Sequence, residues 1–106
     1  MLRELSGDDE GETGAVLRDF LDATVQDVAL LARCREAGDI PAITRQAHKI
    51  KGAARLVGAS ELAHAAGDLE AAGQDGVWSG ILPLAAHVET AVERLKLFVA
   101  ERYSTA

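Results

Sequence analysis

The sequence has little of what several classes of protein require. Cysteine occurs once in 106 residues, as Cys34, which excludes an internal disulfide framework and a zinc site built from several thiolates. No apolar run approaches the roughly 18 to 20 residues that span a bilayer, and no charged-then-apolar start indicates a signal peptide. The 17 Asp and Glu outnumber the 11 Lys and Arg, giving a formal net charge of −6, which argues against nucleic-acid binding. These absences favour a small, acidic, cytoplasmic protein without direct membrane contact.

The residues that are abundant favour helices over strands. Alanine is common and 48% of the residues are apolar, whereas aromatic residues make up only 4%. This composition is typical of helices. No segment alternates between apolar and polar residues for long, and four segments carry apolar residues three and four positions apart. We therefore predict an all-α protein.

The apolar stripes place the four helices between clear stop signals. The predicted helices cover residues of about 13–37, 40–57, 60–72 and 79–102. Gly38 and Gly58 supply C-terminal stops, Asp39 and Ser60 are the expected N-caps, and the glycine-containing segment 73–76 breaks the chain again. Four amphipathic helices with short links favour an up-down-up-down antiparallel four-helix bundle.

The whole chain, residues 1–106, is expected to be one domain. Residues 1–12 are predicted to be an N-terminal turn and an acidic linker, and residues 13–106 the bundle. Within the first segment, residues 2–5 have room for one short extra helical turn. The abrupt start is compatible with excision from a longer protein. The isolated domain is expected to be a monomer.

One predicted helix carries a histidine on its solvent-facing side, together with residues that a purely structural role does not explain. On a helical wheel, His48 falls about 130° from the centre of the apolar face of its helix, so its imidazole is expected to be exposed. Gly52 shares that outward face although glycine costs about 0.5 to 1 kcal/mol in a helix. Lys51 and Arg55 lie on the flank and suit an anion formed on the imidazole. An exposed, neutral imidazole has one ring nitrogen free as a nucleophile. This arrangement indicates a histidine that carries a phosphoryl group.

The residues around His48 resemble the signature of histidine phosphotransfer (HPt) domains. That signature is a histidine, any residue, an aliphatic residue, a lysine and a glycine, with a second glycine six residues after the first. His48, Ile50, Lys51, Gly52 and Gly58 fill these positions. The resemblance covers the helix plan of the whole chain, and it is strongest to the HPt domains at the C-termini of hybrid sensor kinases.

The resemblance implies a role for each matching residue. His48 would take a phosphoryl group on Nε2 from a receiver-domain phospho-aspartate and pass it to the aspartate of a response regulator. Lys51 would contact the phosphoryl group, and Gly52 would leave room for the receiver. In chemotaxis-kinase members a glutamate at the position of Glu70 holds the other ring nitrogen. Gly67 stands where those members carry a second histidine, a departure that favours the hybrid-kinase group.

The partners implied are the receiver domains of a hybrid kinase and of a response regulator. We expect Thr44, Arg45, Ala53 and Arg55 to lie in the docking face. No enzymatic activity, cofactor or metal site of its own is expected, because the Mg²⁺ would belong to the partner receiver. Two alternatives stay open. One is a helical scaffold or receiver-binding module without phosphorylation, and the other is a chemotaxis-type input domain phosphorylated directly by a kinase core.

Overall fold

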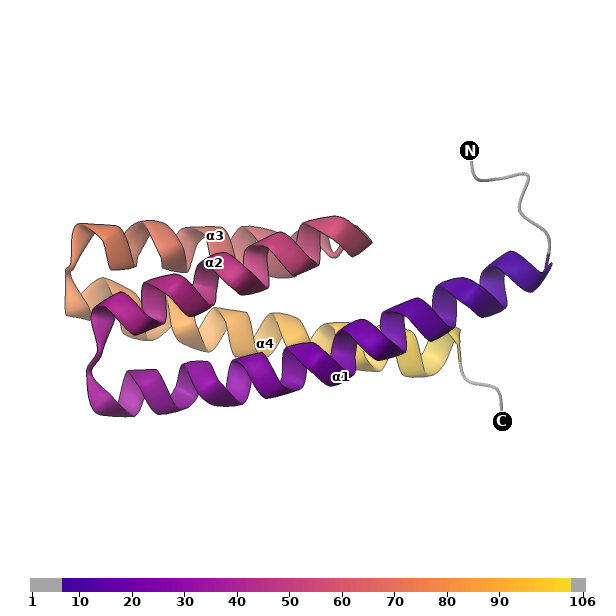
Figure 1. Cartoon of the computed structure of the whole chain (residues 1–106), viewed down its shortest axis with the longest axis horizontal. Helices are drawn as coiled ribbons and strands as arrows, with labels where there is room; N and C mark the ends of the chain where they lie inside the picture. The colour runs from indigo at the N-terminus through magenta and orange to yellow at the C-terminus, as the bar shows by residue number, and fades with distance from the viewer. Residues whose placement is uncertain (1–6, 104–106) are drawn as a thin grey trace.

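The computed structural model describes residues 7–103, without the side chains of residues 7–12, and within that range the chain forms four α-helices. They are α1 (Gly7–Ala37), α2 (Ile40–Val57), α3 (Ser60–Asp75) and α4 (Trp78–Arg102). Each helix runs antiparallel to the one before it (Figure 1). The predicted all-α, up-down-up-down four-helix bundle is confirmed.

The turn between α1 and α2 determines where the helix that carries His48 begins. Gly38 adopts the left-handed conformation (φ 70°), and the Asp39 side chain caps α2 by accepting a hydrogen bond of 3.1 Å from the Ala42 amide. Pro41 fits the first turn, where its missing N–H is not needed. Gly58 (φ 75°) ends α2. The stop and cap signals of this helix are therefore those that the sequence predicts.

Three predicted boundaries are wrong. Helix α1 begins at Gly7 rather than near residue 13, so residues 7–12 are helical. Acidic residues are favoured near a helix N-terminus by the helix dipole, and each glycine costs only about 1 kcal/mol in a helix. Ala59, not Ser60, is the N-cap of α3 and makes no side-chain hydrogen bond there, and α3 continues through Gly73 to Asp75 before Gly76 ends it. The extra turn predicted at residues 2–5 lies outside the described residues.

The core is formed mainly by the apolar faces of α2, α3 and α4. In α2 and α3 the buried residues recur at the spacing of one helix face, between Ile43 and Ala54 and between Leu62 and Gly73. The largest fully buried side chains are Leu31, Ile43, Ile50, Leu62, Leu69, Ile81, Val88 and Thr24. In α1 the stripe is less well covered, because Leu17, Phe20 and Val28 are only half-buried. The core is therefore most complete between α2, α3 and α4.

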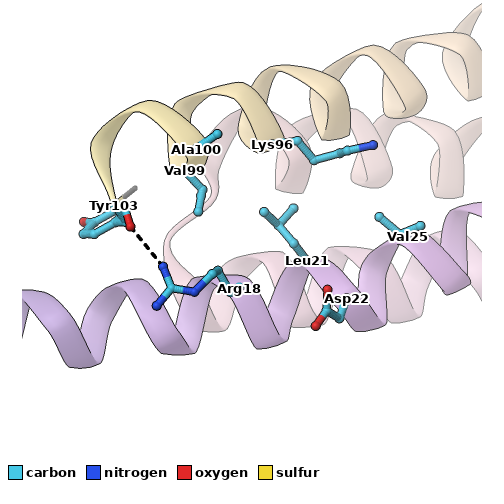
Figure 2. A pocket seen from close by; sticks show the side chains of 8 residues that line it. All are labelled: Arg18, Leu21, Asp22, Val25, Lys96, Val99, Ala100 and Tyr103. Atoms are coloured by element: carbon cyan, nitrogen blue, oxygen red, sulfur yellow. Dashed lines mark hydrogen bonds between the residues drawn. The ribbon is translucent and has the colours of Figure 1, made fainter. Parts of the chain in front are cut away.

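The outer helices α1 and α4 are longer than the α2–α3 pair and extend past it towards the chain termini (Figure 1). Between them lies a groove of about 590 Å³. Leu21 and Val99 point into the space between the two helices, and Arg18 Nη1 donates a hydrogen bond of 3.1 Å to the Tyr103 carbonyl at one end (Figure 2). None of the helices of residues 7–103 combines the length and apolar character needed to cross a bilayer.

Candidate functional site

His48 lies in the middle of α2 on the face turned away from the core. Its neighbours Ala47 and Ile50 are fully buried, whereas 69% of the His48 side chain is exposed. The difference follows from the helical period, because residues one position apart lie about 100° apart around the axis. The ring is thus anchored to a rigid helix and open to a partner.

Glu70 of α3 holds one nitrogen of that ring. Its Oε2 lies 2.8 Å from His48 Nδ1, and only 13% of the Glu70 side chain is exposed. Leu69, the preceding residue, is fully buried and anchors this part of α3 in the core. Because an ionised carboxylate only accepts hydrogen bonds, we assign the proton to Nδ1. The lone pair of Nε2 is then the free nucleophilic position.

Lys51 binds the other oxygen of the same carboxylate. Its Nζ lies 2.7 Å from Glu70 Oε1, and its side chain is 22% exposed. The hydrogen bond from Lys51 is the largest cause that lowers the pKa of Glu70 below its ordinary value; desolvation opposes it, and the hydrogen bond from His48 adds to it. Glu70 is therefore an anion at neutral pH that joins His48 and Lys51.

Gly52 leaves a bare patch of helix one turn after His48. An ideal Cβ at Gly52 would meet no atom within 4 Å, its own helix backbone aside. The fold itself therefore does not require glycine at this position. Open space above a helix backbone beside an exposed imidazole is the geometry that a closely approaching partner needs.

The structure separates the other predicted residues into two groups. Arg45 and Arg55 are exposed on the same side of α2 as His48. Thr44 is half-buried against α3, where its hydroxyl donates to the Ile40 carbonyl at 2.9 Å. Ala53 is half-buried one turn after Lys49, whose ammonium binds Asp27 of α1 at 3.2 Å. Thr44 and Ala53 thus lie on the two flanks of the His48 face rather than at its centre.

Two features of the site were missed by the sequence analysis. Leu56 is 89% exposed, the most exposed of the large apolar side chains in the described part of the chain, and lies one turn after Gly52. Its position off the apolar stripe is a signal that would have found it. The contact between Lys51 and Glu70 was not predicted either, because no sequence pattern states which oxygen of a carboxylate a lysine binds.

The described residues give no sign of a metal centre. Among the described side chains, those of residues 13–103, no group of three or more His, Cys, Asp or Glu is placed to hold a metal ion. His64 Nδ1 lies 3.0 Å from the Ser60 carbonyl, and His87 Nε2 lies 3.8 Å from Glu61. Neither histidine contacts the group formed by His48, Lys51 and Glu70.

Comparison with known proteins identifies one family. The family model described as Hpt domain matches residues 15–97, a range that includes His48, Lys51, Gly52 and Glu70. No curated protein and no solved structure matches the chain.

Proposed function

Because the chain belongs to the Hpt domain family, we propose that it carries a phosphoryl group on Nε2 of His48. Hpt domains are phosphocarriers that act with receiver domains in phosphorelay signalling. The observation that supports His48 most directly is its 2.8 Å contact with Glu70 through Nδ1, which leaves the opposite nitrogen free on an exposed ring.

The transfer follows from the two ring nitrogens. The Nε2 lone pair attacks the phosphorus of an aspartyl phosphate, and the N–P bond forms as the P–O bond to the aspartate breaks. The aspartate leaves as a carboxylate with the bonding electrons. The phosphorylated ring keeps its Nδ1 proton and carries a positive charge, which the Glu70 carboxylate offsets. Transfer to a second receiver runs the same exchange towards a new aspartate.

The remaining groups suit binding and positioning. We assign to Lys51 the neutralisation of charge on the phosphoryl group, because its ammonium lies on the shared carboxylate beside the imidazole. Arg45, Gly52, Arg55 and Leu56 form the docking surface, with Thr44 and Ala53 at its flanks. The receiver supplies the Mg²⁺ of the reaction, and this domain binds no cofactor of its own.

We place the domain in the cytoplasm as a monomeric part of a hybrid sensor kinase that delivers phosphate to a response regulator. A second candidate is an input domain of the chemotaxis-kinase type, phosphorylated directly by a kinase core. The pairing of Glu70 with His48 favours this candidate, since chemotaxis members use a glutamate at this position. Gly67, which replaces their second histidine, favours the hybrid-kinase candidate.

A phosphotransfer assay tests the proposal. The domain is incubated with Mg²⁺ and a panel of phosphorylated receiver domains, and acid-labile, alkali-stable phosphate is measured on it. Label on the wild type and none on His48→Gln is the expected result, with unchanged helix content and melting temperature in the variant. His87→Gln is the matched control, because His87 is exposed on α4, which carries none of the proposed site residues; this variant should be labelled like the wild type.

The same assay separates the candidates. Rapid labelling by a receiver supports the hybrid-kinase assignment, and labelling only by a histidine-kinase core supports the chemotaxis type. Absence of label from every receiver and every kinase core would contradict the phosphocarrier function and leave a scaffold. Label that persists on His48→Gln would contradict the choice of His48.

A further inference from the structure

Gly67 lies on α3 directly beneath the side chain of Lys51. An ideal Cβ at Gly67 would lie 3.4 Å from Lys51 Cδ. Glu70 follows one turn later on the same helix, and Lys51 Nζ reaches its Oε1 at 2.7 Å. The aliphatic stem of Lys51 therefore crosses the bare backbone of α3 at Gly67 on its way to the carboxylate.

This path explains why a long, flexible side chain is held close to the protein. A surface lysine keeps most of its rotamers, and fixing one conformation costs entropy. Packing the apolar stem against a neighbouring surface while the ammonium finds an anion offsets that cost. Lys51 has both contacts, and its side chain is 22% exposed, compared with 66% for the neighbouring Lys49.

The position of Lys51 bears on His48 through Glu70. The two carboxylate oxygens are divided between the two partners, with Oε1 on Lys51 and Oε2 on His48 Nδ1. A carboxylate held at both oxygens cannot rotate without losing one of these contacts. Releasing Lys51 therefore frees Glu70 to turn away from the imidazole.

We propose that Gly67 is a positioning residue for phosphotransfer: its missing side chain lets Lys51 lie across α3 and hold Glu70 against His48 Nδ1. This inference rests on the proposed function. It adds that a side chain longer than a methyl group at position 67 displaces Lys51 and thereby weakens the nucleophile without touching it.

Gly73, two turns later on α3, shows what a glycine required for packing looks like. A Cβ there would overlap the Thr44 hydroxyl and come within 3.4 Å of the Thr44 Cα. At Gly67 no backbone atom of another helix is among the neighbours within 4 Å, and the single contact is to the flexible Lys51 stem. A methyl group at position 67 thus makes an ordinary contact, and larger groups compete with the stem alone.

The test is a series at position 67 with the titration of Glu70 as its first measurement. In Gly67→Ala the NMR titration midpoint of the Glu70 carboxyl and the transfer rate should stay close to wild type, with a raised melting temperature because alanine favours helix. In Gly67→Leu the midpoint should rise towards its ordinary value, and transfer should slow by about tenfold or more, as for other residues that orient a reacting group. Gly67→Met supplies a flexible substitute if the leucine variant does not fold.

Two controls make the result specific. Gly80→Leu on α4, where an ideal Cβ meets nothing within 4 Å, should change neither the Glu70 midpoint nor the rate. In a Lys51→Met background, Gly67→Leu should have no further effect, since the residue through which it acts is gone. A Glu70 midpoint unchanged in folded Gly67→Leu and Gly67→Met, or equal slowing with and without Lys51, would overturn the proposal. If the wild type takes up no phosphate the proposed function fails, whereas the titration still decides the role of Gly67.

Discussion

The α2–α3 pair and the α1–α4 pair are built differently. Half of the ten buried residues of α2 and α3 are small, namely Ala47, Ala54, Ala65, Ala66 and Gly73. The helices α1 and α4 are longer and leave the groove of about 590 Å³ between them (Figure 2). Large apolar side chains stay exposed on these outer helices, among them Leu97 at 63% and Phe98 at 51%.

The difference matters for the site because His48 and Glu70 come from different helices. Their contact of 2.8 Å and that of Lys51 with Glu70 at 2.7 Å depend on the spacing of α2 and α3. Small residues let two helix backbones approach closely, and close-packed contacts transmit small shifts rather than absorb them. The open groove between α1 and α4 does not depend on such a close approach of the two helices. The candidate site therefore lies on the α2–α3 pair, and the α1–α4 pair completes the bundle.

Truncating one leucine in each pair gives the largest expected effect on this comparison. Leu69 is fully buried beside Glu70, so Leu69→Ala should lower the free energy of unfolding by about 2 to 5 kcal/mol. Leu21 borders the groove and is 8% exposed, so Leu21→Ala should cost about 2 kcal/mol or less because little new cavity opens. Urea unfolding of both variants measures the difference. An equal or larger loss at Leu21 would break the distinction between the two pairs.

Adding one methyl group at Gly73 tests how closely α2 and α3 approach. Gly73→Ala should destabilise the fold, because overpacking against Thr44 costs about 1 to 3 kcal/mol and the gain in helix propensity is only about 1 kcal/mol. Thermal unfolding followed by circular dichroism measures the change. Gly80→Ala on α4 is the control and should stabilise, since its Cβ points into open space.

Removing the Thr44 hydroxyl should rescue that variant. In the double variant Thr44→Ala, Gly73→Ala, the overlapping Oγ1 is absent, and the Cβ and Cα of residue 44 remain at 3.1 and 3.4 Å. The cost of the added methyl group should therefore fall below its value in the wild-type background. A cost that is the same in both backgrounds would mean that Thr44 does not set the distance between the helices.

The sequence was sufficient for the helices whose ends carry explicit signals. Gly38, Asp39 and Gly58 fixed the limits of α2, and with them the exposure of His48. It was insufficient where several weak preferences compete, as at the start of α1 and at Gly73, because glycine costs only about 1 kcal/mol in a helix and the helix dipole favours acidic residues in a first turn. A lone Ser60, two residues after Gly58, likewise did not decide the N-cap of α3, which is Ala59.

The site divides in the same way. Features that depend on one helix, such as the exposure of His48 and the bare backbone at Gly52, follow from the period of that helix. Features that depend on two helices cannot be predicted in this way, because a helical wheel of α2 contains no information on how α3 is aligned with it. The division of the Glu70 oxygens between His48 and Lys51, and the passage of Lys51 over Gly67, required the structure. The functional roles of these residues remain predictions.

The smallest expected effect concerns the ion pair between Lys51 and Glu70, which links α2 to α3. Because the pKa of Glu70 is lowered in the folded protein, its contribution to stability is fully present above its ordinary value near 4.5 and is lost as the pH falls through the lowered value. Glu70→Gln should therefore be less stable than the wild type at pH 7, by at most about 1 kcal/mol, and the two should converge as the pH falls below the lowered pKa of Glu70. Urea unfolding at several pH values measures this.

Glu93→Gln is the control for this prediction. It removes the exposed pair with Lys96 on α4 and should show a smaller difference. A gap between Glu70→Gln and the wild type that stays constant down to pH 2 would show that the charge of Glu70 does not link α2 to α3.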